Sequence, residues 1–545
     1  MKRLLHVFFY VHISFLRHLF VAIVFHFWKL FRKDSGFYGF FGKITLDWFE
    51  REGVNVKFKK WVSMTAASLL VATSLFGATS VAQADEGQKR TIAEESIYDL
   101  LVDRFFNGSG DNDFDTNTKD PSKFAGGDFR GLQDKLTFID DMGFSIVSIG
   151  TVFDTEKYDG SMPTSYTKLE EHFGTAEEFQ SVIKAYRAKD MSIMVDFPLN
   201  NVSPEHEWAK DSAKQSWIAS KNNGQVQWDL ANKEVQAALI EAATEFVTTY
   251  AIGGVRLTNI SEADTAFVNE VIEALKETKE SLYVIANEES NAKFDATFSQ
   301  ATADVYRNIF KNVDMDSSKL MDPVSVEQPA QIMVDTLNTH RFTFDSANEN
   351  MFPPTRLKMA MGALFMLPGI PVVQYGTEIA MNGEKAPDTH QLYNFKVDEE
   401  LIDYIGNLQT LRNKSATLRN GDFELITNEN GLLVFTRTSD EEKWVIMVNN
   451  TSKTQRVDLT TEQLGDKKAL NGILNEEKVR LNEKDVYPII LDREMVEVYQ
   501  VKEDEGFNIP YMVALGLVYL LFIGFVVVIM KRGKKRRQEQ DVVNK

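Results

Sequence analysis

The sequence predicts an α/β protein with a parallel sheet, followed by a small all-β domain and one C-terminal transmembrane helix. Short apolar runs alternate with amphipathic helical patterns through about the first three hundred residues after residue 85, which is typical of parallel β/α architecture. From about Phe423 the pattern changes to closely spaced strands, which indicates a separate β domain. Residues 509–530 carry no charged side chain, and roughly 20 apolar residues are enough for a helix to cross a bilayer.

Each predicted strand of the parallel sheet is a short apolar run, because both faces of such a strand are buried. The runs cover residues 145–149, 192–195, 254–257, 282–286 and 370–373. Helical patterns cover residues 176–188 and 233–251. The strands predicted for the β domain cover residues 431–436, 443–448, 486–491 and 496–501.

Composition excludes several classes of function. The chain has 545 residues, with 79 acidic and 60 basic side chains and a formal net charge of -19. This excess of acids argues against a nucleic-acid partner, which requires a basic face to meet phosphate. The chain has no cysteine, so disulfides, thiolate catalysis and cysteine-ligated metal sites are excluded.

The N-terminal region predicts an export signal that begins well inside the chain. A basic head at residues 57–60 precedes an apolar run at 61–76 and the sequence Ala82-Gln83-Ala84. These are the three parts of a secretory signal peptide, which we place at residues 56–84. Residues 1–55 are then an upstream extension that is absent from the mature protein. A membrane-associated leader is the alternative for this segment.

The C-terminal region predicts a membrane anchor at residues 509–530. Six bases follow within residues 531–537, and such clusters mark the cytoplasmic side of a membrane helix. A buried core helix is the alternative. The expected protein is a single-pass protein of a bacterial cell membrane, with its body outside the cell and a basic cytoplasmic tail at residues 531–545.

Several motifs in the body, taken in order, resemble the α-amylase family, glycoside hydrolase family 13. They are IYDLLVDRFFNG at residues 97–108, FAGGD at 124–128, LPGIPVVQYGTEI at 367–379 and LRN at 411–413. The resemblance implies a (β/α)8 TIM barrel over residues 85–420, with a short inserted loop at about 197–232. It also implies a C-terminal antiparallel β-sandwich domain over residues 421–502. In this barrel the loops at the carboxyl ends of the strands form the active site.

The resemblance also implies positions for three catalytic carboxylates, since retaining glycosidases use a nucleophile and an acid/base and this family adds a third acid. The nucleophile position lies two residues after Arg256, at Thr258. The acid/base position is Glu288, or Glu289 if the register slips by one residue. The third-acid position is Asn338. Two of the three carboxylates are therefore replaced.

Three further residues match substrate-binding positions of the family, namely Tyr158, Asp196 and Arg256. Arg256 normally orients the nucleophile. Because no carboxylate stands at position 258, we expect the Arg256 guanidinium to pair with Glu288 instead. Such an ion pair would hold Glu288 ionised, which is the wrong state for a general acid.

Three functions remain open. The first is a catalytically impaired pseudoenzyme that binds α-glucan, or a protein partner that the sequence does not identify. The second is an active α-glucan hydrolase or transglycosidase in which another acid, such as Glu262, Asp264 or Asp345, replaces the nucleophile. The third is an envelope scaffold without enzymatic activity. A displacement of about 1 Å is poorly tolerated in catalysis, which disfavours the second function.

Calcium is the one cofactor that the resemblance implies. The expected ligands lie in one loop, and oxygen-rich, closely spaced ligands suit a hard cation. An ordinary polar turn is the alternative. These ligands are Asn107, Asp111, Asn112, the Gly126 carbonyl and Asp128, and a second, weaker site would involve Asn200.

The inserted loop contains Trp208, Trp217 and Trp228. Exposed tryptophans would offer flat faces on which sugars stack. The alternative, which we favour, is that these side chains form the core of the loop.

Overall fold

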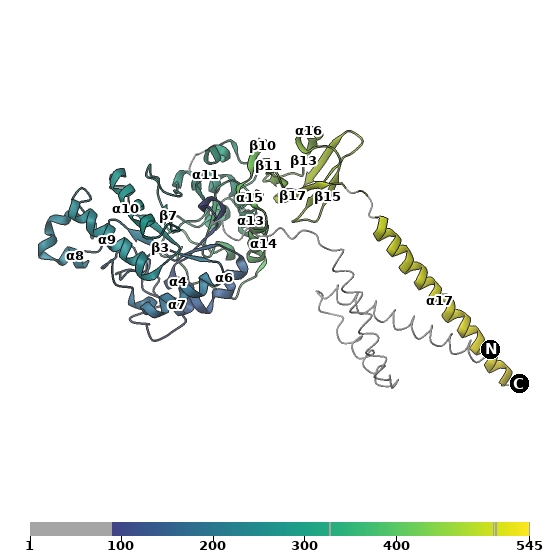
Figure 1. Cartoon of the computed structure of the whole chain (residues 1–545), viewed down its shortest axis with the longest axis horizontal. Helices are drawn as coiled ribbons and strands as arrows, with labels where there is room; N and C mark the ends of the chain where they lie inside the picture. Colours follow the sequence, from purple (N-terminus) through teal and green to yellow (C-terminus); the bar gives the residue numbers. More distant parts are fainter. Residues whose placement is uncertain (1–89, 326–328, 505, 507–508, 544–545) are drawn as a thin grey trace. The chain divides into compact units, whose positions relative to one another are not determined.

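The computed structural model describes residues 90–325, 329–504, 506 and 509–543 (Figure 1). The predicted upstream extension at residues 1–55 and the predicted signal peptide at 56–84 lie outside the described residues.

The first domain is built on a seven-stranded parallel sheet with the order β7-β6-β3-β2-β1-β9-β8. Nearly every residue of these strands is buried, which explains why continuous apolar runs predicted five of them, all except β1 and β8. The strands are β1 (Ile97–Asp99), β2 (Ile146–Ser148), β3 (Ser192–Pro198), β6 (Gly254–Thr258), β7 (Tyr283–Ala286), β8 (Gln331–Ile332) and β9 (Ile370–Gln374).

Two residues between β7 and β8 close this sheet into a barrel. Ala296 forms a parallel bridge with Ile285 of β7, and Thr297 forms a parallel bridge with Ala330 beside β8. The Ala286 amide donates to the Ala296 carbonyl at 3.0 Å, and the Gln331 amide donates to the Thr297 carbonyl at 3.0 Å. The predicted (β/α)8 barrel is confirmed, with its sixth strand reduced to this pair of bridges.

Helices cover the outside of the barrel and begin at recognisable caps. In α7 (Ala176–Arg187) the Thr175 hydroxyl and the Glu178 carboxylate form a capping box. In α9 (Lys233–Tyr250) the Asn232 side chain accepts from the Glu234 amide. Both helices match their predicted positions. The remaining barrel helices are α4 (Val102–Phe105), α5 (Phe129–Asp134), α6 (Leu136–Met142), α10 (Thr265–Thr278), α11 (Gln300–Phe310), α12 (Phe342–Asn348), α13 (Pro353–Leu364), α14 (Glu400–Lys414) and α15 (Ala416–Asn420), with 3-10 turns η1 (Ile92–Glu94), η2 (Glu171–Phe173), η4 (Ser318–Ser325) and η5 (Thr377–Ile379).

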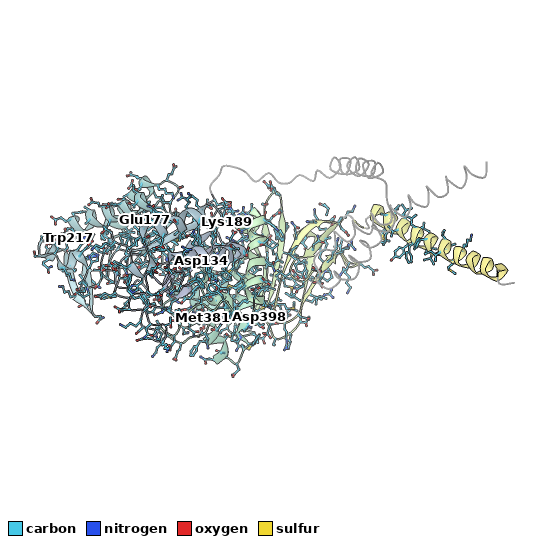
Figure 2. The ribbon with its side chains drawn as sticks, turned by 90° about the horizontal axis from the view of Figure 1, so that it is seen from below. Asp134, Glu177, Lys189, Trp217, Met381 and Asp398 are labelled. Carbon is cyan, nitrogen blue, oxygen red and sulfur yellow. The ribbon has the colours of Figure 1, made fainter. Side chains whose placement is uncertain are left out.

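The insert after β3 is a small folded unit rather than a simple loop. It contains α8 (Glu207–Lys210), η3 (Ser212–Trp217), β4 (Ile218–Asn222) and β5 (Gln225–Trp228). Trp217, which Figure 2 labels, and Trp228 are both buried. Trp208 packs on both, with ring-centroid distances of 5.4 and 5.8 Å. The tryptophans therefore form the core of the insert, as favoured from the sequence.

The C-terminal domain is an antiparallel β-sandwich with a six-stranded and a two-stranded sheet. Leu459 and Tyr487 from the smaller sheet share one apolar core with Val434 and Tyr499 from the larger sheet. The domain contains β10 (Asp422–Glu429), β11 (Leu432–Thr438), β12 (Lys443–Asn449), β13 (Gln455–Thr460), β14 (Lys468–Gly472), β15 (Lys478–Arg480), β16 (Val486–Leu491), β17 (Met495–Glu503) and the short helix α16 (Thr461–Leu464).

The last element is α17 (Ile509–Val543), which contains the predicted membrane segment. Its part from Met512 to Lys531 is long and apolar enough to cross a membrane, and it is the one such helix among the described residues. Its apolar side chains are exposed, so α17 is not the buried core helix considered as the alternative.

Candidate active site

The residues predicted to form the site lie in the carboxyl-terminal part of barrel strands or follow them, where active sites lie in this fold. Asp196 lies in β3, and Arg256 and Thr258 lie in β6. Glu288 follows β7 by two residues, and Asn338 lies in the turn after β8.

Arg256 is held by two carboxylates inside the barrel. Its Nε and Nη2 donate to Asp196 at 2.7 and 2.9 Å, and its Nη1 and Nη2 donate to Asp99 at 3.0 and 3.1 Å. All three side chains are almost fully buried. The expected ion pair between Arg256 and Glu288 is therefore wrong, because Asp99 and Asp196 already occupy the guanidinium.

The charges of this cluster depend on one another. Burial by itself lowers the pKa of Arg256, but the Asp196 and Asp99 carboxylates outweigh it and raise that pKa above the ordinary value. Burial raises the pKa of Asp196, against the attraction of Arg256. The guanidinium is therefore permanently charged, and it stabilises the ionised form of its partners.

Glu288 contacts the loop after β6 instead of Arg256. Its Oε1 accepts a hydrogen bond from the Ile260 amide at 2.8 Å, and its side chain is half-buried. The next residue, Glu289, is exposed and bonds to the Ser299 hydroxyl. Of the two acids that the sequence left open, Glu288 is the one turned toward the end of β6.

The two substituted positions differ in exposure. Thr258 is the last residue of β6 and is buried. Asn338 is exposed, and its backbone amide donates to the Thr336 hydroxyl at 3.3 Å. Neither residue supplies a carboxylate to the site.

The acids considered as replacements are engaged elsewhere or exposed. Asp264 caps α10 through the Ala266 amide at 2.8 Å. Asp345 accepts from Arg307 at 2.6 Å and lies 2.9 Å from His340. Glu262 is exposed on the turn before α10.

Contacts to both the hydroxyl and the ring hold the Tyr158 side chain in place. The Arg104 guanidinium lies over the ring, 3.8 Å from its centroid. The Tyr158 hydroxyl lies 2.9 Å from Nδ1 of His390, and Nε2 of His390 lies 2.8 Å from the Leu337 carbonyl. A carbonyl only accepts, so Nε2 of His390 carries a proton. Burial lowers the pKa of His390 and favours the neutral ring, in which Nδ1 accepts from the Tyr158 hydroxyl. Sequence reasoning missed His390, which lies far along the chain from both partners.

The loop predicted to bind calcium is organised around Asp128. This carboxylate accepts from the amides of Gly108, Ser109 and Gly131 at 3.0, 2.8 and 2.5 Å. Burial raises the pKa of Asp128, and the hydrogen bonds oppose this shift. Asp128 therefore also acts as the N-cap of α5.

The other predicted ligands fit a cation only in part. The Asn112 Oδ1 atom is buried and has no hydrogen-bond partner, so it is free to accept a cation. The side-chain Nδ2 of Asn107 donates to both carboxylate oxygens of Asp113, an acid that was not among the predicted ligands. Asp111 is exposed on the same loop. The donor set consists of carboxylate, amide and carbonyl oxygens, which suits calcium.

Asn200 does not fit a second cation site. Its Oδ1 accepts from the Trp228 amide at 2.7 Å and from the Asn201 amide at 3.0 Å. Both lone pairs of that oxygen are therefore used.

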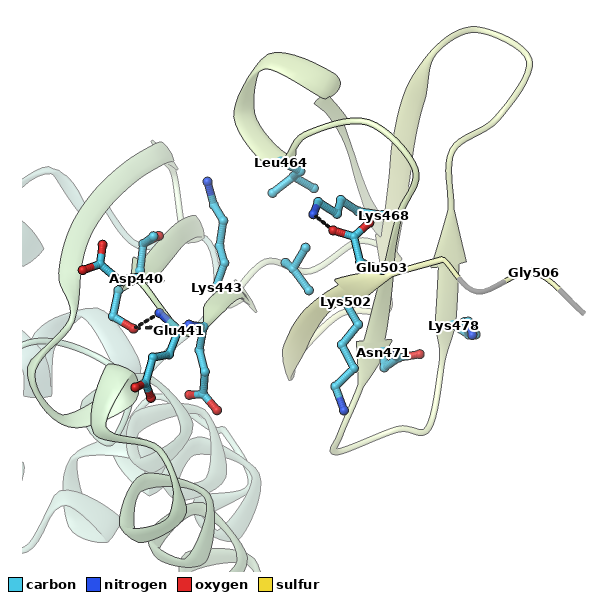
Figure 3. A pocket seen from close by; sticks show the side chains of 14 residues that line it. Asp440, Glu441, Lys443, Leu464, Lys468, Asn471, Lys478, Lys502, Glu503 and Gly506 are labelled. Carbon is cyan, nitrogen blue, oxygen red and sulfur yellow. Dashed lines mark hydrogen bonds and ion pairs between the residues drawn. The ribbon is translucent and has the colours of Figure 1, made fainter. Parts of the chain in front are cut away.

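A separate hollow of about 920 Å³ lies in the C-terminal domain (Figure 3). Acidic residues Asp440 and Glu441 line one side, and Lys468, which is paired with Glu503, lines another. Its charges are mixed and no catalytic position of the barrel contributes to it, so the hollow does not belong to the candidate active site.

Comparison with known proteins identifies both domains. Residues 99–237 match the family model of the α-amylase catalytic domain, and residues 421–499 match that of the α-amylase C-terminal domain. The intracellular maltogenic amylase of Bacillus subtilis (strain 168) is 24% identical over 429 residues, which are 69% of this chain and 71% of that protein. The beta/alpha-amylase of Paenibacillus polymyxa is 24% identical over 456 residues, 74% of this chain but only 37% of that protein's length.

Two solved structures resemble the chain more strongly. The Anoxybacillus α-amylase superposes with a TM-score of 0.74 at 34% identity, over 77% of this chain and 100% of that one. The Geobacillus thermoleovorans α-amylase, solved in complex with acarbose, superposes with a TM-score of 0.72 at 31% identity, over 76% of this chain and 100% of that one. The chain belongs to the α-amylase family.

Proposed function

We propose that this protein is a membrane-anchored, cell-surface α-amylase homologue that binds α-glucan and hydrolyses it very slowly or not at all. The observation that carries the proposal is the identity and setting of position 258. There, a buried threonine follows an arginine whose guanidinium is already held by Asp196 and Asp99.

The proposed loss of activity follows from the chemistry of glycoside cleavage. A retaining glycosidase needs one carboxylate to attack the anomeric carbon and another acid to protonate the leaving oxygen. The Thr258 hydroxyl carries no charge that would stabilise an oxocarbenium ion, and Asn338 brings no negative charge to the sugar hydroxyls. Loss of the covalent nucleophile of a serine protease costs on the order of 10⁶ in turnover.

The proposed binding of α-glucan is supported by the groups that remain. Glu288 stays half-buried at the end of β7, and Asn338 is exposed with an amide that can bond to hydroxyls. Relatives of the chain are named maltogenic amylase and cyclomaltodextrinase, and one related structure holds acarbose. These names support an α-glucan as the ligand class.

The proposed location rests on α17 and the residues after it. The apolar part of α17 ends at Met530, and six bases follow within residues 531–537. The bases would remain in the cytoplasm, and the barrel and β-sandwich would lie outside the cell. We include calcium in the proposal, held by the loop of Asp128 and Asn112, where it would add a fixed positive charge that ties the loop together.

A paired assay tests this function. The full-length protein in detergent micelles is incubated with maltodextrins and a fluorogenic α-glucoside, and binding to maltoheptaose is measured by calorimetry. The expected result is saturable binding with turnover no higher than that of a Glu288→Gln variant. Clear turnover that Glu288→Gln abolishes would contradict the proposal and identify an active hydrolase. Absence of both binding and turnover would also contradict it and favour a protein partner or scaffold role.

A further inference from the structure

Asp99 contacts the Arg256 guanidinium from another strand, and Thr258 lies two residues after Arg256 on the same strand. Arg256 is in register with Asp196 on the neighbouring strand β3, whereas Asp99 lies on β1, which is separated from β3 by β2. Arg256 therefore reaches across the barrel interior to meet Asp99. Thr258 follows Arg256 by two residues on the same strand, so both side chains point to the same face, about 7 Å apart along the strand.

The guanidinium has almost no capacity left for another acid. An arginine side chain offers five N–H donors. Four hydrogen bonds to Asp99 and Asp196 already use Nε, Nη1 and Nη2, with distances between 2.7 and 3.1 Å. Two carboxylates against one guanidinium leave a local excess of negative charge. A third carboxylate at position 258 would face that excess in a buried, weakly screening environment.

We propose that Asp99 is a positioning residue that takes over the counter-ion role of the missing acid at position 258, so that the barrel tolerates Thr258 only while Asp99 is present. This inference rests on the proposed function only in its assignment of position 258 as the nucleophile position. In this account Asp99 holds the Arg256 side chain extended across the barrel. Restoring an acid at position 258 alone then creates repulsion instead of an active site.

A double-mutant cycle on stability tests the inference without reference to glucan. The apparent Tm of the full-length protein in micelles is measured for wild type, Asp99→Asn, Thr258→Asp and the double variant. Asp99→Asn removes two charge-assisted hydrogen bonds that anchor the Arg256 guanidinium, and Thr258→Asp adds an unpaired buried charge, so each single change should lower the Tm by about 5 °C or more. The double variant should lose clearly less than the sum of the two single losses.

Thr258→Asn is the matched control, because it changes the shape of position 258 without adding charge. Its loss in Tm should simply add to that of Asp99→Asn. Additive losses with Thr258→Asp would overturn the inference, as would equal coupling with Thr258→Asn. If Asp99→Asn does not fold, recovery of folded protein on adding Thr258→Asp supports the inference, and failure of that recovery contradicts it. The result is independent of glucan binding and turnover, so it separates this inference from the proposed function.

Discussion

His390 joins two segments of the candidate site through one neutral imidazole. Its Nδ1 accepts from the Tyr158 hydroxyl at 2.9 Å, and its Nε2 donates to the Leu337 carbonyl at 2.8 Å. Leu337 directly precedes Asn338, so the histidine ties the turn after β8 to the loop that carries Tyr158. In a protonated imidazole Nδ1 would become a donor, so the Tyr158 hydroxyl would have to turn its hydrogen away and accept instead.

This arrangement predicts a dependence of stability on pH. Burial lowers the pKa of His390 below its ordinary value, against the opposing effect of the Leu337 carbonyl. The unfolded chain therefore takes up a proton on His390 near pH 6.5 while the folded chain does not, so this group's contribution to folding stability falls as the pH drops below about 6.5. Urea unfolding of wild type and His390→Gln at pH 7.5 and 5.5 measures this effect. The stability advantage of wild type should shrink at pH 5.5, and an advantage that grows at pH 5.5 would contradict the assignment.

The raised pKa of Asp103 predicts the opposite dependence of folding stability on pH. Burial raises the pKa of Asp103 to about 6, against attraction by Arg104, whose Nη1 lies 3.0 Å from Oδ2. Between about pH 4 and pH 6 the folded state binds the proton more tightly than the unfolded state, so this group's contribution to stability falls as pH rises through that window. A shift of two pKa units corresponds to at most about 3 kcal/mol.

Asp103→Asn isolates this contribution, because asparagine does not titrate. The unfolding free energy of wild type minus that of Asp103→Asn should decrease between pH 4.5 and pH 6.5, as measured by urea titration. This variant leaves both Arg104 and Tyr158, which contact each other, in place. A difference that stays constant or increases over the same range would show that Asp103 is ionised throughout.

Calcium binding at the loop of Asp128 predicts a stability gain that chelation removes. A ligand at 100 times its dissociation constant adds about 2.7 kcal/mol to the folded state. Addition of millimolar calcium to protein treated with EGTA should therefore raise the Tm by a few degrees. Asp111→Asn should weaken the gain without disturbing the cap of α5, since Asp111 is exposed and Asp128 makes the cap. Equal Tm values with calcium and EGTA would contradict the predicted site.

The sequence predicts most of the barrel because its strands are buried on both faces. Such strands are continuous apolar runs, as in β7 (Tyr283–Ala286) and β9 (Ile370–Gln374). The sixth strand could not be found in this way, because it consists of two bridging residues, Ala296 and Thr297, with no apolar run of its own.

The candidate site was predictable only where a motif is local in sequence. Thr258 and Arg256 lie in one strand, so their relationship follows from the spacing alone. Asp99 lies 157 residues from Arg256, and His390 lies 232 residues from Tyr158, so these partners appear only after folding. The expected pairing of Arg256 with Glu288 was wrong for the same reason. Asp99 lies on β1 and was not among the acids expected at the site.

The absence of a nucleophilic carboxylate is tested most directly by trapping the covalent intermediate. A retaining glycosidase forms a glycosyl-enzyme, and a fluorinated α-glucosyl fluoride slows its hydrolysis so that it accumulates. Intact-protein mass spectrometry after incubation with this reagent measures any adduct, with an active α-amylase as the positive control. The account predicts an unmodified mass for this protein, because Thr258 stands at the nucleophile position and the Arg256 charge is already paired with Asp99 and Asp196. A single glucosyl adduct on an aspartate or glutamate of the barrel would contradict it.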